Sequence, residues 1–388
     1  MRIGIDATCW GNWRGYGRFA RSLIRALLEI DAANDYVLFF DSQCTDRPAR
    51  GRHVLVSTSQ PQVEAASAEG RRSIPDLWRM TMAVAREPLD LFFCPSVYSY
   101  FPLLGRWPKV ITVHDTIAET YPNLIFRTAS TRLFWNAKLW LAIRQADRVV
   151  TVSDYARRDL SRTFGIAASR IGIIADAPDE IFRPPASTEE ARQAVHERHG
   201  LAAPYLLYVG GFGPHKNLRA LIDSFAVIAG DPRHAAVSLA LVGKREGDAF
   251  YSTVSDLDRQ IDRLGLGSRV RFLGFVPDED LVRLYQAAEA LVLPSLKEGF
   301  GLPGIEAMSC ATPVLATRES ALPEILGDAG ILIDPRQPRE LTAGLEALLA
   351  DPDRRARLRL AALERAGLFG WKRSAEQALA IFAECRGS

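Results

Sequence analysis

Short apolar runs recur along the chain, separated by stretches whose apolar residues follow helical spacing. The first runs lie at residues 3–5, 35–40, 90–94, 109–113, 148–152 and 170–174. The alternation restarts after a proline-rich segment, with runs at 205–209, 237–242, 270–275, 290–294, 313–317 and 330–333. Runs of this length are typical of parallel strands buried on both faces. The pattern predicts an α/β protein with two doubly wound, Rossmann-like sheets.

The pair Pro184 and Pro185 marks the expected domain boundary, because proline continues neither a helix nor a central strand. We therefore predict one domain over residues 1–183 and a second over residues 184–370. Beyond residue 335 the pattern is helical to the end, with a break around residues 367–370. The last helix, over residues 371–388, is predicted to cross back to the first domain.

The overall composition argues against several functional classes. The 388 residues include 48 basic and 46 acidic side chains, so the chain lacks the basic excess of a nucleic-acid-binding protein. No apolar stretch approaches the length of a membrane span, and the start resembles a strand more than a secretion signal. Five scattered cysteines without a CxxC pair favour reduced core thiols. We expect a soluble cytoplasmic protein, at most peripheral at the inner face of the membrane; the pattern favours no particular oligomeric state.

Residues that directly follow the apolar runs are the first candidates for chemistry, because open parallel sheets bind ligands beyond the carboxyl ends of their strands. After the run at 290–294, Glu298 lies in a glycine-rich loop and Glu306 lies one turn into the helix that Pro303 begins. Glycines let the backbone approach a ligand, and the start of a helix attracts anions. This loop is predicted to hold a diphosphate, with Glu306 at a ribose and Glu298 at a sugar. The predicted cradle consists of Gly299, Phe300, Gly301 and Leu302.

With these residues in view, the segment 205–335 resembles the donor-binding half of retaining glycosyltransferases of family four. Glu298 and Glu306, with seven residues between them, match the paired-glutamate motif of that family. The resemblance implies a GT-B fold, in which an acceptor-binding first domain and a donor-binding second domain face a central cleft. It also implies that Glu298 contacts the transferred sugar and Glu306 the nucleotide ribose.

A second glycine-rich segment follows the run at 205–209 and contains Lys216, which would neutralise the diphosphate and the leaving nucleotide. Members of the family usually carry an arginine here as well. This chain has Gly211 and His215 at the plausible positions, and a neutral histidine lacks the bidentate fork of arginine. Either the diphosphate is therefore held more weakly or another cation contributes, and the candidate cation is Lys244.

In the first domain, His114 and Asp115 follow a predicted strand. A lone histidine is more often structural than catalytic. His114, however, matches a histidine that approaches the donor sugar in the family, so we predict that it is catalytic together with Lys216 and Glu298. Asp115 is predicted to orient the ring or the acceptor hydroxyl.

The glycine-rich loop after the first strand precedes an apolar helix that we expect over residues 19–28. The loop resembles the segment that lies near the donor phosphates and the acceptor in the family, although its glycines fit a dinucleotide fingerprint only loosely. We assign Gly15 and Gly17 to the donor, and Tyr16 and Arg18 to the acceptor.

Residues 131–144 combine apolar residues at helical spacing with three basic ones. Two interpretations are open. In the favoured one the helix packs on its own sheet; in the other, Trp135 and Trp140 hold the chain against a lipid surface or a lipid-linked acceptor.

The predicted reaction is retaining transfer of a hexose from a nucleotide diphosphate sugar to a saccharide or lipid-linked acceptor, in polysaccharide or glycoconjugate synthesis. GDP-mannose is slightly favoured over UDP-glucose. No Asp-x-Asp pair follows a strand, so no metal or other cofactor is expected. Base contacts are expected near Phe275 and Val276, and acceptor contacts within residues 42–75. A sugar-nucleotide epimerase, a nicotinamide oxidoreductase and a non-catalytic nucleotide-sugar-binding module are the alternatives.

Overall fold

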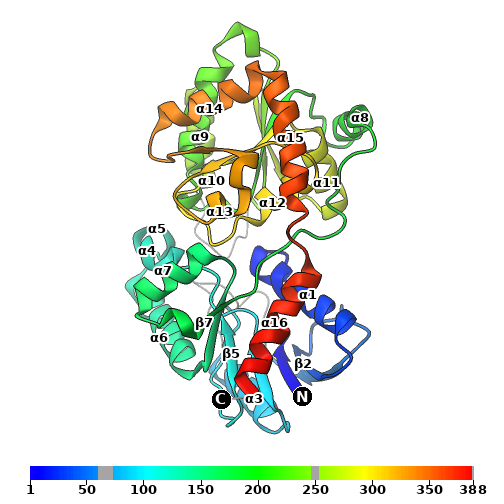
Figure 1. The fold of residues 1–388 in the computed structure, drawn as a ribbon. Helices are drawn as coiled ribbons and strands as arrows, with labels where there is room; N and C mark the ends of the chain where they lie inside the picture. The colour runs from blue at the N-terminus through cyan, green and yellow to red at the C-terminus, as the bar shows by residue number, and fades with distance from the viewer. Residues whose placement is uncertain (60–72, 246–252, 387–388) are drawn as a thin grey trace. The chain divides into compact units, whose positions relative to one another are not determined.

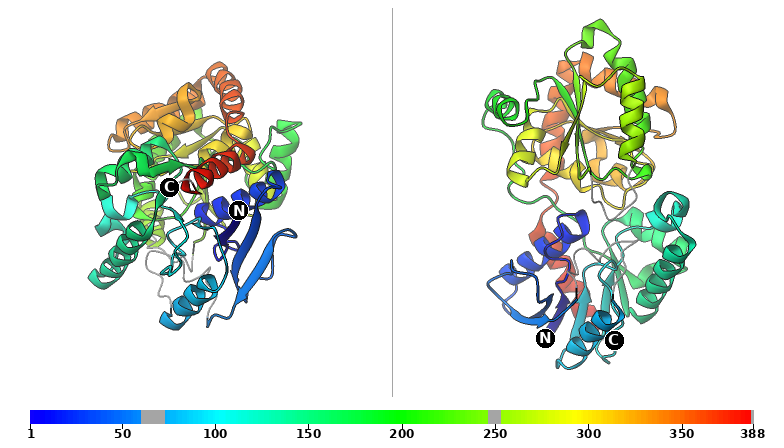
Figure 2. Two further views of the ribbon diagram at one scale, coloured as in Figure 1. Left: turned by 60° about the horizontal axis from the view of Figure 1, so that its bottom comes forward. Right: turned by 180° about the vertical axis from the view of Figure 1, so that it is seen from behind.

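The computed structural model describes residues 1–59, 73–245 and 253–386, and these form two compact units (Figure 1). Unit 1 consists of Met1–Ala177 together with Gly370–Ser388, and unit 2 is Pro178–Phe369. Each unit is built on a parallel sheet with helices on both faces, as Figure 2 shows. The predicted fold class, with two doubly wound sheets, is confirmed.

Unit 1 contains a seven-stranded sheet in the order β3-β2-β1-β4-β5-β6-β7, with every neighbouring pair parallel. Its central strands are short and buried, completely in β4 and except for the first residue in β6, as expected for strands covered on both faces. The strands are β1 (Arg2–Asp6), β2 (Asp35–Asp41), β3 (Arg52–Val56), β4 (Leu91–Cys94), β5 (Lys109–Thr112), β6 (Arg148–Thr151) and β7 (Ile171–Ile173). The helices are α1 (Gly15–Ile30), α3 (Ile74–Ala85), α4 (Ile117–Thr120), α5 (Pro122–Ile125), α6 (Ala129–Gln145), α7 (Asp154–Phe164), η1 (Ala168–Arg170) and α16 (Trp371–Arg386).

Helix α16 packs within unit 1, although it follows all of unit 2 in the sequence. The ring of Phe382 lies 5.2 Å from that of Phe93 on β4, and the hydroxyl of Ser374 donates to the carbonyl of Ala175. Gly172 on β7 leaves space for Ile381, whose Cδ1 would lie only 2.6 Å from a Cβ at that position. The helix therefore forms part of the core of unit 1.

Unit 2 contains a six-stranded parallel sheet in the order β10-β9-β8-β11-β12-β13. The strands are β8 (Tyr205–Val209), β9 (Ser238–Val242), β10 (Val270–Gly274), β11 (Ala290–Leu293), β12 (Val314–Thr317) and β13 (Gly330–Ile333). The longer helices are α8 (Thr188–His199), α9 (Leu218–Ala229), α10 (Val254–Arg263), α11 (Asp278–Ala287), α12 (Leu302–Ser309), α14 (Pro338–Ala350) and α15 (Pro352–Ala366). The short ones are η2 (Pro214–Lys216), η3 (Pro232–His234), α13 (Leu322–Leu326) and η4 (Gly327–Ala329).

The boundary between the units lies at Ala177 and Pro178, six residues before the predicted one. Residues 178–183 belong to unit 2, and a ring contact and a hydrogen bond attach the end of this segment to α11. The ring of Phe182 packs edge-on against Tyr285 of α11, and Gln286 Nε2 donates to the carbonyl of Arg183. The proline pair thus follows the boundary.

Both sheets reverse their strand order once, between β1 and β4 in unit 1 and between β8 and β11 in unit 2. At such a switch point the segments after the two adjacent strands diverge and leave a crevice at the carboxyl edge of the sheet. In unit 2 these segments are residues 210–217 and 294–301, which contain most of the predicted donor site.

Candidate functional site

Lys216 and Glu298 meet at the switch point of unit 2. Lys216 Nζ lies 2.7 Å from Glu298 Oε1, and the hydroxyl of Ser295 donates to the same oxygen at 2.6 Å. The two segments are also joined by their backbones, because the N–H of Leu296 donates to the carbonyl of His215. Two residues that the sequence places 82 positions apart thus form one ion pair at the carboxyl edge of the sheet.

The charges of this pair depend on each other. Burial by itself would raise the pKa of Glu298, but the charge and hydrogen bond of Lys216, with the Ser295 hydroxyl, hold that pKa below its usual value. Burial and the nearby charge of Lys216 lower the pKa of His215 to about 3, against the opposing effect of Glu298. His215 is therefore neutral near pH 7, and Lys216 carries the positive charge of this loop.

The start of α12 has the geometry of an anion cradle. Gly301 precedes the helix with φ of 91°, and a Cβ there would lie 2.4 Å from Leu322 Cδ2, so only glycine fits. On the facing segment Asn217 also has a left-handed backbone and donates to the carbonyls of Pro294 and Pro335. The unpaired N–H groups at the start of a helix, together with its dipole, favour a bound phosphate.

Glu306 is buried on α12, and its Oε2 accepts a hydrogen bond of 2.9 Å from the hydroxyl of Tyr285. Its negative charge helps to raise the pKa of the neighbouring Cys310, although burial is the larger cause. A carboxylate held in this way accepts hydrogen bonds in a fixed direction, as recognition of a ribose diol requires.

The other predicted donor residues lie on the same edge of the unit 2 sheet, with different exposure. Lys244 is exposed after β9, which neighbours β8, and Phe275 is exposed after β10, with Val276 buried beside it. The carbonyl of Gly211 accepts from the hydroxyl of Tyr208.

Within the predicted cradle, Gly299 and Gly301 lie in the loop, and Leu302 begins α12. The Phe300 side chain is buried against Phe369, with ring centroids 5.8 Å apart. Phe300 therefore offers its backbone, not its ring, to a ligand.

In unit 1, His114 lies two residues after the end of β5 and is buried. Its Nε2 lies 3.1 Å from the carbonyl of Pro95, which can only accept, so Nε2 carries the proton and Nδ1 is an acceptor. Burial lowers the pKa of His114 to about 4, despite the opposing hydrogen bond to Pro95. Asp115 Oδ1 accepts from the N–H of Ile117 and shapes the turn before α4.

The first loop of unit 1 differs from its prediction in one respect. Helix α1 begins at Gly15, not at residue 19, so Gly15, Tyr16, Gly17 and Arg18 all lie in its first turn. A Cβ on Gly17 would lie 2.2 Å from the carbonyl oxygen of Asn12, which explains the glycine. Tyr16 stacks on Tyr98 at 4.7 Å, and both Tyr16 and Arg18 are buried.

Two residues of the site were missed from the sequence. Ser295 lies two residues after the end of β11 and directly after the apolar run at 290–294, and that position was the signal that would have identified it. Tyr285 lies in the apolar pattern of α11, 21 positions before Glu306, and gives no local signal of its contact with that residue.

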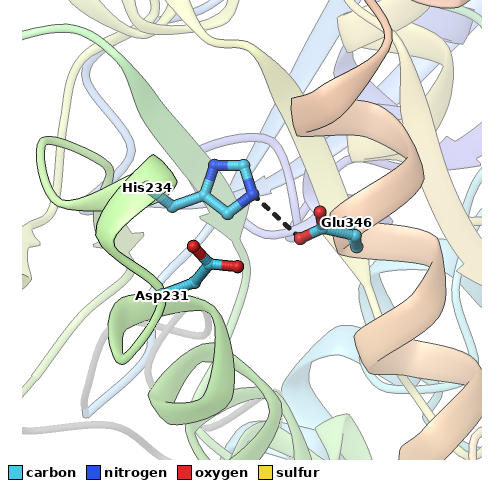
Figure 3. Close-up of side chains that lie close together, drawn as sticks. All are labelled: Asp231, His234 and Glu346. Carbon is cyan, nitrogen blue, oxygen red and sulfur yellow. Dashed lines mark hydrogen bonds and ion pairs between the residues drawn. The ribbon is translucent and has the colours of Figure 1, made fainter.

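Among the residues that the structure describes, Asp231, His234 and Glu346 form the group that could hold a metal ion (Figure 3). His234 Nε2 lies 2.8 Å from Glu346 Oε2, but Arg233 Nη2 pairs with Asp231 at 2.6 Å and with Glu346 at 2.9 Å. Because η3 lies just before β9, the group is at the amino edge of the sheet, away from the donor segments. It fits an ion-pair network that joins η3 to α14.

Helix α6 has a packed face and an exposed face. Trp135 is 4% exposed and donates to Glu119 Oε1, so the interpretation of this tryptophan as a lipid contact is wrong. Trp140 is 62% exposed, as are Leu133 at 71% and Phe134 at 47%. Within the described residues, this and every other helix is too short or too polar to cross a membrane.

Comparison with known proteins identifies the family. Residues 13–177 match the family "Glycosyltransferase Family 4", and residues 191–365 match "Glycosyl transferases group 1". The Escherichia coli O-antigen chain mannosyltransferase B is 34% identical over 275 residues, which are 70% of this chain and 68% of the relative. The E. coli serotype-specific mannosyltransferase WbdA is 25% identical over 95% of this chain, but the chain spans only 46% of its length.

The fold has solved counterparts. Sucrose-phosphate synthase from Thermosynechococcus elongatus superposes with a TM-score of 0.75 over 99% of this chain and 98% of its own, at 21% identity. The two parallel-sheet units, the paired glutamates Glu298 and Glu306 and the matches along both units agree. The chain therefore belongs to glycosyltransferase family 4 and is a glycosyltransferase with the GT-B fold.

Proposed function

We propose that this glycosyltransferase transfers mannose from GDP-mannose to a saccharide or lipid-linked acceptor, with retention at the anomeric carbon. The observation that carries the proposal is the Lys216–Glu298 ion pair beside the start of α12. Lys216 supplies a positive charge for a diphosphate, and the start of α12 supplies backbone N–H groups for it. Glu298 supplies a carboxylate for a sugar. Unit 2 is then the donor-binding domain and unit 1 the acceptor-binding domain.

In this proposal each candidate site residue of unit 2 binds one part of the donor. Lys216 and the backbone N–H groups of residues 299–302 bind the diphosphate, and Lys244 supplies a second positive charge after β9. Glu306 accepts hydrogen bonds from the ribose, and Glu298 accepts them from the sugar. The ring of Phe275 and the backbone around Val276 contact the base.

Lys216 also has a role in the chemical step. As the bond between the anomeric carbon and the phosphate oxygen breaks, negative charge grows on the leaving diphosphate, and Lys216 and the α12 start stabilise that charge. The acceptor hydroxyl attacks from the same face of the sugar, and its proton passes to the departing phosphate oxygen. No metal ion is required, because these groups neutralise the charge that Mg²⁺ would otherwise meet.

In unit 1, His114 is neutral and presents Nδ1 as an acceptor, so it binds a sugar hydroxyl without adding charge. Asp115 orients the acceptor hydroxyl, and the first turn of α1 completes the binding surface with Gly15, Tyr16, Gly17 and Arg18. The choice of mannose is supported by the mannosyltransferase names of the relatives. Solved complexes with UDP-glucose belong to a protein only 20% identical to this chain and support the fold alone.

The exposed face of α6 supports a peripheral membrane contact. Its 17 residues include no acidic side chain, and Arg132 and Arg144 accompany the exposed Leu133, Phe134 and Trp140. Apolar side chains flanked by basic ones suit the surface of an anionic bilayer. We therefore place the enzyme at the inner face of the membrane, where a lipid-linked acceptor would be available.

A thermal-shift screen tests the donor site. The protein is heated with GDP, UDP, ADP and their mannose, glucose and N-acetylglucosamine conjugates, and compared with Glu306→Ala and with the control Glu189→Ala, whose side chain is 84% exposed. We expect guanine nucleotides to raise the Tm by several degrees in the native protein and the control, but not in Glu306→Ala. No shift with any nucleotide, or equal shifts in all three proteins, would refute the site.

An activity assay tests the reaction. Incubation with GDP-mannose and extracted lipid-linked saccharides should release GDP and extend the acceptor. Turnover of the nucleotide sugar to an isomer without any acceptor would show an epimerase instead.

A further inference from the structure

The hydroxyl of Tyr285 donates to Glu306 Oε2 in the interior of unit 2. Both side chains are buried, Tyr285 in the last turn of α11 and Glu306 in α12. A buried tyrosine hydroxyl needs a polar partner, and a bond to a carboxylate is stronger than one to a neutral group. The bond therefore connects two helices at the residue assigned to the ribose.

Tyr285 is itself fixed from several sides. Its carbonyl accepts from the hydroxyl of Thr312 at 2.6 Å, and its ring meets the edge of Phe182 with centroids 5.8 Å apart. The neighbouring Gln286 holds the carbonyl of Arg183. A side chain restrained in this way imposes its geometry on the group it contacts, because neither partner can rotate without losing buried contacts.

We propose that Tyr285 is the positioning residue for Glu306, and that it holds the carboxylate in the orientation that accepts hydrogen bonds from the ribose hydroxyls of the donor. The inference rests on the proposed role of Glu306. A carboxylate has lone pairs for about four hydrogen bonds, so the bond from Tyr285 is compatible with bonds from a diol. Without Tyr285, Glu306 would have to be ordered at the moment of binding, and that cost would appear as weaker affinity.

The inference predicts a loss of affinity that depends on the ribose. Tyr285→Phe keeps the ring that packs on Phe182 and removes only the hydroxyl. Hydrogen bonds to charged groups typically change equilibria by roughly ten- to a hundredfold, so GDP should bind to the variant weaker by about that factor. Ligands without ribose hydroxyls should bind to the variant and to the native protein equally.

The experiment is calorimetric titration of the full chain with GDP, 2′,3′-dideoxy-GDP and pyrophosphate. The proteins are the native chain, Tyr285→Phe, Glu306→Gln and Tyr36→Phe. The last is a matched control, because Tyr36 in unit 1 donates to Asp31 Oδ2 and its loss removes another buried tyrosine–carboxylate bond. We expect Tyr285→Phe and Glu306→Gln to weaken GDP alone, and Tyr36→Phe to bind all three ligands like the native protein.

Two outcomes would overturn the inference. One is native affinity of Tyr285→Phe for GDP while Glu306→Gln is impaired, which would leave the proposed function intact. The other is an equal loss for GDP and pyrophosphate in Tyr285→Phe, which would mean general damage to the diphosphate loop. If Glu306→Gln also binds GDP like the native protein, the ribose role of Glu306 fails, and the proposed donor site fails with it.

Discussion

At the scale of single residues, the Lys216–Glu298 pair has a double role. In the structure the two side chains neutralise each other, whereas the proposed function assigns Lys216 to the diphosphate and Glu298 to the sugar. The donor must therefore compete with Glu298 for the lysine. A negatively charged diphosphate makes that exchange possible because it replaces one carboxylate by two phosphates.

Lys216→Met should separate stability from binding. The substitution leaves Glu298 with the Ser295 hydroxyl but without its cation, and we expect unit 2 to lose about 2 kcal/mol of unfolding free energy, less than for a fully buried pair. GDP affinity should fall as well. Adding Glu298→Gln should restore most of the stability but not GDP binding, as measured by circular dichroism in urea and by calorimetry. Restored binding in the double variant would contradict the role of Lys216.

His114 should make unit 1 sensitive to acid. Its pKa is about 4 in the folded protein and about 6.5 in an unfolded chain, so stability is complete above pH 6.5 and is lost as the pH falls toward 4. At pH 5 the loss relative to pH 7 is about 2 kcal/mol, from 1.4 kcal/mol per pH unit. In the variant His114→Gln, the loss of unfolding free energy that comes from protonation of the imidazole should be absent.

The measurement for His114 is urea unfolding at pH 7 and pH 5, followed by tryptophan fluorescence. All seven tryptophans lie in unit 1, so this signal reports that unit alone. Equal pH dependence in the native protein and in His114→Gln would show that the imidazole is not kept neutral by burial.

Residues at strand ends were predictable because the topology of a parallel sheet brings them together. Lys216, Glu298 and His114 all follow strands, and the structure places them there. Tyr285 was not predictable, since its contact with Glu306 depends on how α11 packs against α12 and not on either local pattern.

At the scale of elements, α6 has one face packed in the core of unit 1 and one face exposed. Trp135 packs on Tyr98 within unit 1, with ring centroids 5.2 Å apart, whereas Trp140 points away from that core and is exposed. The sequence pattern alone left both tryptophans open to either role. Only the rotation of the helix about its axis, which packing sets, distinguishes them.

Substitution of Trp140 should weaken membrane binding. We expect the native protein to sediment with phosphatidylglycerol vesicles at low salt and less so at high salt, because the attraction is partly ionic. Trp140→Ala should reduce the bound fraction several-fold. The control Trp78→Ala removes an equally exposed tryptophan from α3, 60% exposed, and should bind like the native protein. Equal binding by both variants would exclude α6 as the contact.

The elements themselves were largely predictable, with two informative exceptions. Strand β3 lies at the sheet edge, where all but its last residue are exposed or only partly buried, so it lacks the continuous apolar run of a central strand. The start of helix α1 was predicted too late, because Gly15 and Gly17 disfavour helix and yet lie inside it. At Gly17 the close approach of Asn12 outweighs helix propensity.

At the scale of the whole molecule, we expect the proposed donor site to work without a divalent cation. Transfer of mannose should proceed at an unchanged rate in EDTA, because Lys216 and the α12 start neutralise the diphosphate. The assay compares initial rates of GDP release with EDTA and with added Mg²⁺ or Mn²⁺. A rate abolished by EDTA and restored by either ion would contradict the metal-free mechanism.

The place of α16 in unit 1 has a consequence for how the chain is made. A ribosome synthesises the 192 residues of unit 2 after β4 and before α16, which takes roughly 10–40 s at typical elongation rates. During that interval Phe93 lacks the packing of Phe382, and unit 1 exposes an apolar surface that would bind chaperones or misassemble. Unit 2, which is continuous in sequence, meets no such delay. The second unit to be translated is therefore the first that can finish folding.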